Sequence, residues 1–195
     1  MHNLFQRRRS IRKYLNKEVP DKKIKRILEA ARWAPSAHNA QPWRFLVIKD
    51  ASIKKKLAKA MAKRWKKDLS FDGVIKKESK DLILSSIKRF SESPILILVC
   101  LTMKDMKNYK DKRRKRIEFI LALQSISAAI ENILLAAISE DLGACWFCAP
   151  LFCQQSVMSE LKLPKELEPQ ALITIGYFDK EPKAPNRLAL RDIIL

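Results

Sequence analysis

The sequence contains very little glycine: Gly73, Gly143 and Gly176 are the only three in 195 residues. The Rossmann dinucleotide fingerprint and the Walker A loop both need closely spaced glycines, because the backbone must approach a phosphate group. Neither motif can be built here. A nucleotide-like cofactor would therefore have to be bound by arginine, serine and asparagine side chains and by backbone at the ends of helices and strands.

Potential metal ligands are also scarce. The histidines are His2 and His38, and the cysteines are Cys100, Cys145, Cys148 and Cys153. Cys145 and Cys148 have CxxC spacing, which leaves a thiol redox pair or a metal site open, but no second CxxC accompanies them. The apolar sequence around the cysteines is typical of buried free thiols. We predict no metal site, and we keep the redox pair as an alternative.

Acidic residues are outnumbered: 21 Asp and Glu stand against 40 Lys and Arg, which gives a net charge of +19. A field of this sign attracts nucleic acid, acidic membranes, or phosphorylated cofactors and substrates. The densest basic run, residues 110–116, is typical of a solvated face or loop. A basic nucleic-acid-binding protein without catalytic activity is therefore an alternative function, although no recognised nucleic-acid motif accompanies the charge.

No long apolar run is uninterrupted. The longest, residues 119–138, is broken by Gln124, Ser125, Ser127, Glu131 and Asn132, and each of these would need a polar partner inside lipid. The basic N-terminal residues are not followed by the apolar segment of a signal peptide. We expect a cytoplasmic protein that is not embedded in a membrane.

Hydrophobic periodicity predicts a single α+β or mixed α/β domain over residues 1–195. Helices are expected at 20–34, within 51–90 with a break near 72–73, at 116–142 and at 154–161. Strands are expected at 45–48, 94–101, 144–148 and 172–178, with the two at 94–101 and 144–148 buried on both faces. The 116–142 helix is apolar on nearly all sides, so we expect it at the centre of the fold or at a subunit interface.

Two polar segments stand out from this pattern. Residues 8–14, RRSIRKY, concentrate arginines and a hydroxyl in the way that a phosphate-binding site requires. Residues 34–45, APSAHNAQPWRF, form a proline-stiffened connection between a helix and a strand. Its small polar side chains are suited to hydrogen bonding with a flat heterocycle. Taken alone, residues 8–14 also fit an ordinary basic N-terminus, and residues 34–45 also fit an ordinary connecting loop.

Together, these segments at this separation resemble the nitroreductase family of FMN proteins. Residues 128–146, 169–177 and 185–194 continue the resemblance, which covers the chain from about residue 4 to 195. The resemblance implies an α+β nitroreductase-like fold, with a central mixed, mostly antiparallel sheet flanked by helices. It also implies a homodimer with the long central helix at the interface. Residues 51–93 correspond to a variable helical cap on the substrate side.

The resemblance also implies a set of cofactor contacts. Arg8 and Ser10, helped by Arg187, would bind the FMN phosphate, and Arg9 belongs to the same motif. Arg12 would face the pyrimidine edge of the flavin. Pro35, Ser36 and Asn39 would contact the ring and ribityl chain, and a backbone N–H near Cys148 and Ala149 would reach flavin N5. Family members commonly have glycine where Cys148 stands, which could narrow the space beside N5.

Within the family, residues 34–45, 149–153 and 163–172 look like the flavin reductase domain of deazaflavin-coenzyme biosynthesis, which in bacteria is fused to a glutamate ligase. The segment 61–68 is similar to the substrate-side helix of that subgroup. An acidic residue at the position of Asp68 contacts the deazaflavin there. The resemblance therefore implies that Asp68 is a substrate-binding residue.

The implied function is an FMN-dependent NAD(P)H oxidoreductase. NADH or NADPH would be a transient donor, and electrons would pass through FMN to a small-molecule acceptor by a ping-pong mechanism. Nitroaromatics, quinones and deazaflavin precursors, including anionic ones, are the acceptors considered. No side-chain nucleophile is expected, because the flavin carries the chemistry. A flavin carrier or sensor without turnover is a further alternative.

Overall fold

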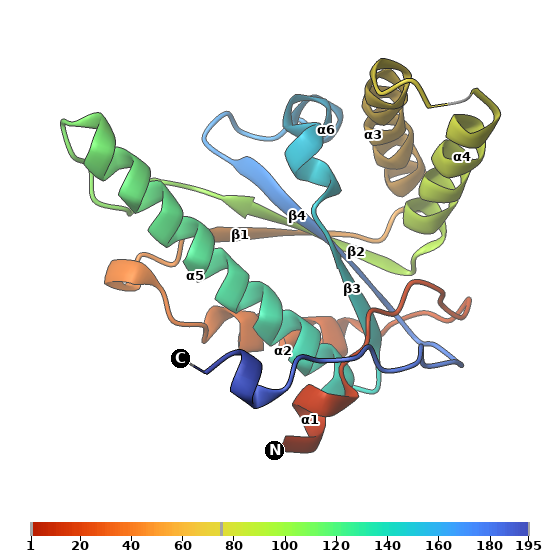
Figure 1. The fold of residues 1–195 in the computed structure, drawn as a ribbon, viewed down its shortest axis with the longest axis horizontal. Helices are drawn as coiled ribbons and strands as arrows, with labels where there is room; N and C mark the ends of the chain where they lie inside the picture. The colour runs from red at the N-terminus through yellow and green to blue at the C-terminus, as the bar shows by residue number, and fades with distance from the viewer. Residues whose placement is uncertain (1, 75, 195) are drawn as a thin grey trace.

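The computed structural model describes residues 2–74 and 76–194. Met1, Ile75 and Leu195, which fall within the predicted 1–195 domain, lie outside the described residues. The centre of the fold is a four-stranded sheet in the order β1-β2-β4-β3 (Figure 1). Its strands are β1 (Trp43–Ile48), β2 (Ile95–Leu101), β3 (Gly143–Phe147) and β4 (Glu168–Gly176). All three strand pairs are antiparallel. An isolated parallel bridge between Ser10 and Ala144 adds the N-terminal segment to the β3 edge.

Helices cover both faces of this sheet. They are α1 (His2–Arg7), α2 (Asp21–Arg32), α3 (Ala51–Phe71), α4 (Lys76–Glu92), α5 (Lys112–Ser139) and α6 (Gln154–Leu161). Short 3₁₀ turns lie at η1 (Ala37–Asn39), η2 (Ala149–Phe152) and η3 (Leu190–Asp192). In Figure 1, α2 and α5 lie on one side of the sheet, and α3, α4 and α6 lie on the other. The result is a three-layer α+β arrangement, which confirms the predicted fold class.

Strand alternation divides the core between these layers, because successive side chains of a strand point to opposite faces. On β2, Ile95, Ile97 and Val99 pack with the α2 and α5 side chains. Leu96 and Leu98 pack instead with Leu57, Phe90 and Val157 of the opposite layer. Every residue of β2 is buried. The prediction of a strand buried on both faces is therefore confirmed for this segment.

The long helix α5 buries one face and leaves the other partly open. Ala122, Ile126, Ile130, Ile133 and Leu134 are buried against α2 and the sheet. Ile117 and Ile120 remain exposed on the other side of the helix. By length and composition, α5 is the one helix among the described residues that could cross a membrane. Its buried face, however, packs as the face of a core helix does.

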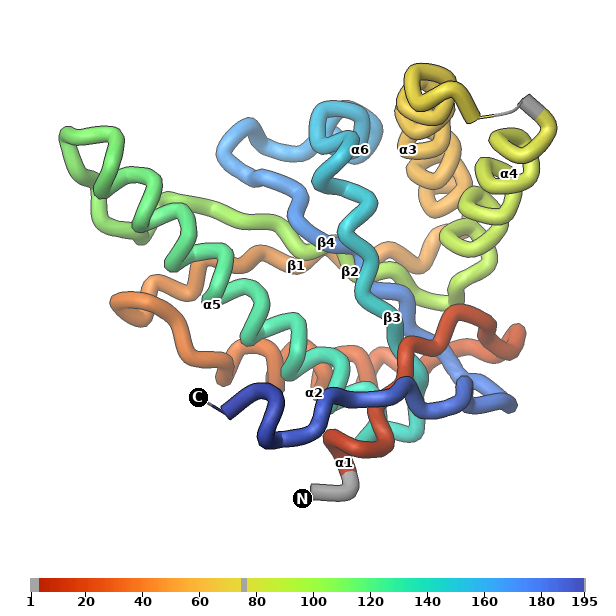
Figure 2. The backbone as a smooth tube through the Cα atoms, viewed as in Figure 1, coloured from red at the N-terminus to blue at the C-terminus, as the bar shows by residue number. Residues whose placement is uncertain are grey.

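The C-terminal segment has no strand or α-helix of its own. After β4 it runs back toward α2 and α1, so the two chain ends lie on the same side of the molecule (Figure 2). Residues 179–194 are exposed throughout. They include four large apolar side chains that are each more than half exposed: Leu188, Leu190, Ile193 and Ile194.

Several predicted boundaries move. The helix α5 begins four residues earlier than predicted, because the Asp111 side chain accepts a hydrogen bond from Arg114 N and caps it. The basic run 110–116 therefore leads into the exposed first turns of α5. The predicted strand 172–178 begins at Glu168 instead. The strand β3 is not buried throughout as predicted, because Trp146 is 36% exposed at the edge of the sheet.

Candidate functional site

The N-terminal segment is fixed along β3 by backbone and side-chain hydrogen bonds. Ile11 N donates to Ala144 O over 3.0 Å. The Tyr14 hydroxyl contacts Ile11 O at 2.5 Å and Thr174 Oγ1 at 2.6 Å, and burial raises the pKa of Tyr14. These contacts hold the segment from Ser10 to Tyr14, which includes Arg12, in one extended path beside the sheet.

This path brings Arg8 and Ser10 into a cavity with the end of β3. The cavity has a volume of about 360 Å³ and is lined by Arg8, Ser10, Glu131, Leu134, Ala144, Cys145, Trp146 and Cys148. Three predicted cofactor residues, Arg8, Ser10 and Cys148, therefore share one cavity. Arg8 Nε lies 3.7 Å from Glu131 Oε1 of α5. A bound anion would compete with this carboxylate for the guanidinium group.

Arg12 lies beside this cavity. Its Nη1 donates to Ser10 O over 3.3 Å. Burial raises the pKa of the Cys145 thiol, and the positive charge of Arg12 opposes that shift. Arg12 is therefore close enough to influence groups on the cavity wall.

The structure separates two other predicted cofactor-binding residues, Arg9 and Arg187, from this cavity. Arg9 turns back toward the protein, and its Nη1 donates to Gln6 O and Arg8 O. It lines a smaller cavity of about 150 Å³ next to Asp141 and Glu181. Arg187 is exposed in the C-terminal segment. It has no ion pair or hydrogen bond with the part of the chain that the structure describes.

The loop with Pro35, Ser36 and Asn39 lies against the N-terminal half of α5. Ala37 N donates to Ser125 Oγ of that helix over 3.1 Å, whereas the Arg8 cavity is lined by Glu131 and Leu134. The orange loop and the red N-terminal segment are accordingly far apart in Figure 1. One chain alone does not bring the two predicted halves of the cofactor site together.

The conformation of this loop is unusual. His38, Asn39 and Gln41 all have positive φ angles, of 57°, 54° and 46°. Left-handed backbone costs roughly 1–3 kcal/mol for each non-glycine residue, so surrounding contacts must hold it. Ser36 Oγ accepts a hydrogen bond from Gln41 N over 3.1 Å. Of these three residues, Asn39 is the one that is predicted to contact the flavin.

Asp68 lines a separate cavity of about 380 Å³ between α3, α4 and the β3–η2 connection. Its carboxylate is paired with Arg64 at 2.9 Å. Ala149 lines the same cavity, whereas the preceding Cys148 lines the Arg8 cavity. The two cavities share no lining residue, but the consecutive residues Cys148 and Ala149, where the flavin N5 contact is predicted, line one cavity each.

Aromatic residues that sequence reasoning did not single out line the Asp68 cavity: Trp65, Phe90, Phe147 and Phe152. Phe90 and Phe147 pack edge to face with ring centroids 5.1 Å apart. Arg89 lies over the Phe147 ring at 5.5 Å. The clustering of aromatic and basic residues within 64–90 is the one sequence signal that could have indicated this cavity.

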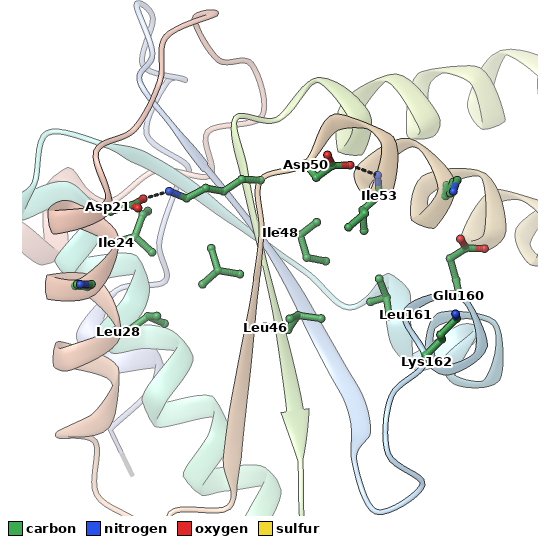
Figure 3. Close-up of a pocket in the computed structure, with 14 residues that line it drawn as sticks. Asp21, Ile24, Leu28, Leu46, Ile48, Asp50, Ile53, Glu160, Leu161 and Lys162 are labelled. Atoms are coloured by element: carbon green, nitrogen blue, oxygen red, sulfur yellow. Dashed lines mark hydrogen bonds and ion pairs between the residues drawn. The ribbon is translucent and has the colours of Figure 1, made fainter.

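A larger cavity, about 740 Å³, lies along the free edge of β1 and contains none of the predicted site residues. Figure 3 shows Ile24 and Leu28 from α2 facing Leu46 and Ile48 of β1, with Leu161 on the opposite side. Asp21 is paired with Lys49, and Asp50 accepts a hydrogen bond from Ile53 N. These two carboxylates thus have local structural partners.

No group of three or more His, Cys, Asp and Glu side chains is arranged for a metal ion among the described residues. All four cysteines are free.

Comparisons with known proteins agree with this geometry. The model of the Nitroreductase family matches residues 5–177. An Archaeoglobus fulgidus protein described as "Putative NADH dehydrogenase/NAD(P)H nitroreductase" is 28% identical over 174 residues, covering 87% of this chain and 80% of its own. Human "Iodotyrosine deiodinase 1" is 29% identical over 198 residues. The match covers 95% of this chain but only 63% of the deiodinase.

Solved structures show the same fold. A "BluB-like flavoprotein" from Clostridium difficile superposes with a TM-score of 0.82 at 26% identity, over 100% of this chain and 97% of that one. A Desulfovibrio desulfuricans structure described as "a putative nitroreductase in complex with fmn" gives 0.74 at 27% identity, over 100% and 94% of the two chains.

Proposed function

The chain belongs to the nitroreductase family and is an FMN-dependent oxidoreductase, and from this premise we propose that it passes electrons from NADH or NADPH to a small organic acceptor in the cytoplasm. The observation that carries the proposal is the shared cavity of Arg8, Ser10 and Cys148. In this cavity, the cationic Arg8 and the hydroxyl group of Ser10 lie beside the end of β3.

The donor groups of this cavity fit FMN. The Arg8 guanidinium and the Ser10 hydroxyl supply charge-assisted and neutral hydrogen bonds for a phosphate. Arg12 would lie at the pyrimidine edge of the flavin, and the backbone near Cys148 and Ala149 at N5. We assign Arg9 to the end of α1 rather than to the cofactor, since backbone carbonyls already occupy its guanidinium group.

The second half of the site would come from a second copy of the chain. Pro35, Ser36 and Asn39 do not line the Arg8 cavity of their own chain, so we propose a homodimer in which each FMN contacts both chains. Two apolar surfaces support this assembly: Ile117 and Ile120 on α5, and the exposed C-terminal segment that carries Arg187. An adjacent copy would cover both.

Bound FMN would supply the hydride chemistry, and no side-chain nucleophile is needed. The residues of this chain bind and orient the cofactor, and the Asp68 cavity provides the neighbouring space for donor and acceptor. If the two use this space in turn, ping-pong kinetics follow. Nitroaromatics, quinones and deazaflavin precursors are the acceptors proposed, with the deazaflavin link resting on the similarity of segments 34–45 and 61–68. Neither the geometry nor the family membership supports nucleic-acid binding.

Titration of the apoprotein with FMN and with riboflavin tests the assignment. Wild type is expected to prefer FMN, because charge-assisted bonds to phosphate contribute about 1.5–3 kcal/mol each. Arg8→Ala should lose much of this preference, and Arg9→Ala, the matched control, should keep it. Anaerobic bleaching of the FMN complex by NADH or NADPH tests the donor. Equal affinity of wild type for the two flavins would overturn the proposal.

A further inference from the structure

A buried acid holds the strained loop against α5. Glu118 is only 3% exposed, and its Oε1 lies 3.3 Å from His38 Nε2. Glu118 and Ser125 are seven residues apart, so both project from the same face of α5. Ser125 receives the Ala37 N–H. Two polar side chains of an otherwise apolar helix face therefore point at one loop.

The second oxygen of Glu118 is buried and has no hydrogen-bond partner within the described residues. An unsatisfied buried carboxylate oxygen is costly, and native proteins rarely retain one without a reason. A leucine at this position would pack in the core without that cost. The buried carboxylate of Glu118 thus indicates a role that an apolar side chain could not fill.

The other charged side chains of α5 do not contact His38 in place of Glu118. Residues 112–116 form its first turns and are exposed, and Arg114 is paired with Asp111. Glu131 is about 20 Å farther along the helix axis, at 1.5 Å per residue, and contacts Arg8. Glu118 is the carboxylate with which His38 pairs in the structure.

We propose that Glu118 is a positioning residue that acts through His38: it fixes the left-handed loop 36–41, so that Ser36 and Asn39 meet the FMN bound to Arg8 and Ser10 of a second copy. The inference rests on the proposed function. Glu118 touches neither cofactor nor substrate, and its effect crosses from one chain to the other.

The first test measures FMN affinity of the apoprotein by flavin fluorescence. Glu118→Gln and His38→Ala should each weaken FMN binding about tenfold, and the double variant should be no weaker than either alone. Glu29→Gln is the matched control, because Glu29 forms an exposed ion pair with Arg32 just before the loop. Its FMN affinity should be that of wild type. Unchanged affinity in both Glu118→Gln and His38→Ala would overturn the inference.

The second test asks whether Glu118 acts between chains. Co-expression of differently tagged Glu118→Gln and Arg8→Ala chains, followed by tandem purification, yields mixed dimers. In a shared site, one pocket combines the intact Arg8 of one chain with the intact loop of the other. Each mixed dimer should then bind one FMN with wild-type affinity. A structural defect alone would not be repaired by mixing.

Different outcomes would contradict the role of Glu118 and the proposed function. Mixed dimers with two weakened sites, or a monomeric protein, would overturn the action of Glu118 between chains. Wild-type apoprotein that binds no FMN would overturn the proposed function itself, and the inference with it. Wild type that binds FMN, while the Glu118 and His38 variants bind it equally well, would overturn the inference alone.

Discussion

At the scale of single residues, Arg12 is the cation that we propose to face the flavin ring. Its guanidinium is held over Ser10 O and influences the Cys145 thiol, so it stands next to the Arg8 cavity without closing it. A cation near the pyrimidine edge of a flavin favours the negatively charged reduced form and raises its reduction potential.

Arg12→Met should therefore lower the FMN reduction potential and slow reduction by NAD(P)H more than it weakens FMN binding. Arg12→Lys keeps the charge, so its FMN reduction potential should lie between those of Arg12→Met and wild type. Anaerobic spectroelectrochemical titration measures the potential. An unchanged potential in Arg12→Met would remove this residue from the pyrimidine edge.

The four thiols differ sharply in accessibility. Burial raises the pKa of Cys100 to about 12 and of Cys153 to about 11, and burial also raises the pKa of Cys145. Cys148 is exposed. Because the thiolate is the reactive form, a raised pKa lowers the thiolate fraction at a given pH and slows the reaction of the thiol.

A disulfide reagent at pH 8 should therefore modify one thiol of the native protein rapidly and the other three slowly. Cys148→Ser should abolish the fast reaction. Saturating FMN should protect Cys148, since this residue lines the proposed cofactor cavity. A fast reaction that FMN does not slow would place Cys148 away from the cofactor and reopen the question of a separate thiol function.

At the scale of elements, the contact between the N-terminal segment and β3 positions the proposed phosphate ligands. Gly143, at the start of β3, leaves room for Ile11: an added Cβ would lie 2.6–2.8 Å from three atoms of that side chain. Since Ile11 follows Ser10 directly and its N–H bonds Ala144 O, any displacement here moves the phosphate-binding residues.

Gly143→Ala should lower the free energy of unfolding by about 1–3 kcal/mol, the usual cost of overpacking, and should weaken FMN binding as well. Gly73→Ala is the control. Gly73 has a φ of +71° and no atom within 4 Å of an added Cβ, so a modest loss of stability with unchanged FMN affinity is expected. Urea unfolding and FMN titration measure the two effects. Unchanged FMN affinity in Gly143→Ala would show that the segment tolerates displacement.

At the scale of the whole molecule, the incomplete cofactor site and the exposed apolar surfaces point to the same assembly. The apolar residues of α5 are divided: Ile130 and Leu134 are buried inside the chain, whereas Ile120 is 42% exposed. A charge at Ile130 or Leu134 would disrupt the core of one chain. A charge at Ile120 tests the interface.

Ile120→Glu should dissociate the dimer and remove FMN binding while the folded chain remains soluble, because an obligate interface of this kind buries well over about 2,000 Å². Ile53→Glu is the matched control, since Ile53 is 43% exposed but lies in the cavity beside β1. This control should remain a dimer in sedimentation at micromolar concentration. A wild-type monomer that retains FMN would contradict both the interface and the shared site.

Much of the fold was predictable from local patterns. The α6 boundaries were predicted without error, and the helix before Pro35 and the strand β2 were placed to within two or three residues. The start of α5 was missed because the Asp111 cap lies in a run of charges with no apolar period. The half-exposed end of β3 was missed because Trp146 and Phe147 have strand-forming side chains whether or not another element covers them.

The sequence by itself determined which segments form helices and strands, and it predicted a set of residues for a flavin site, because periodicity and motifs depend on neighbours along the chain. Only the tertiary structure decided which of these residues meet. It placed Arg8 and Ser10 beside the C-terminal half of α5 and the loop of Ser36 and Asn39 beside its N-terminal half, turned Arg9 away, and buried Glu118 against His38. Such contacts depend on the path of the chain around the sheet, and no short segment of sequence encodes that path.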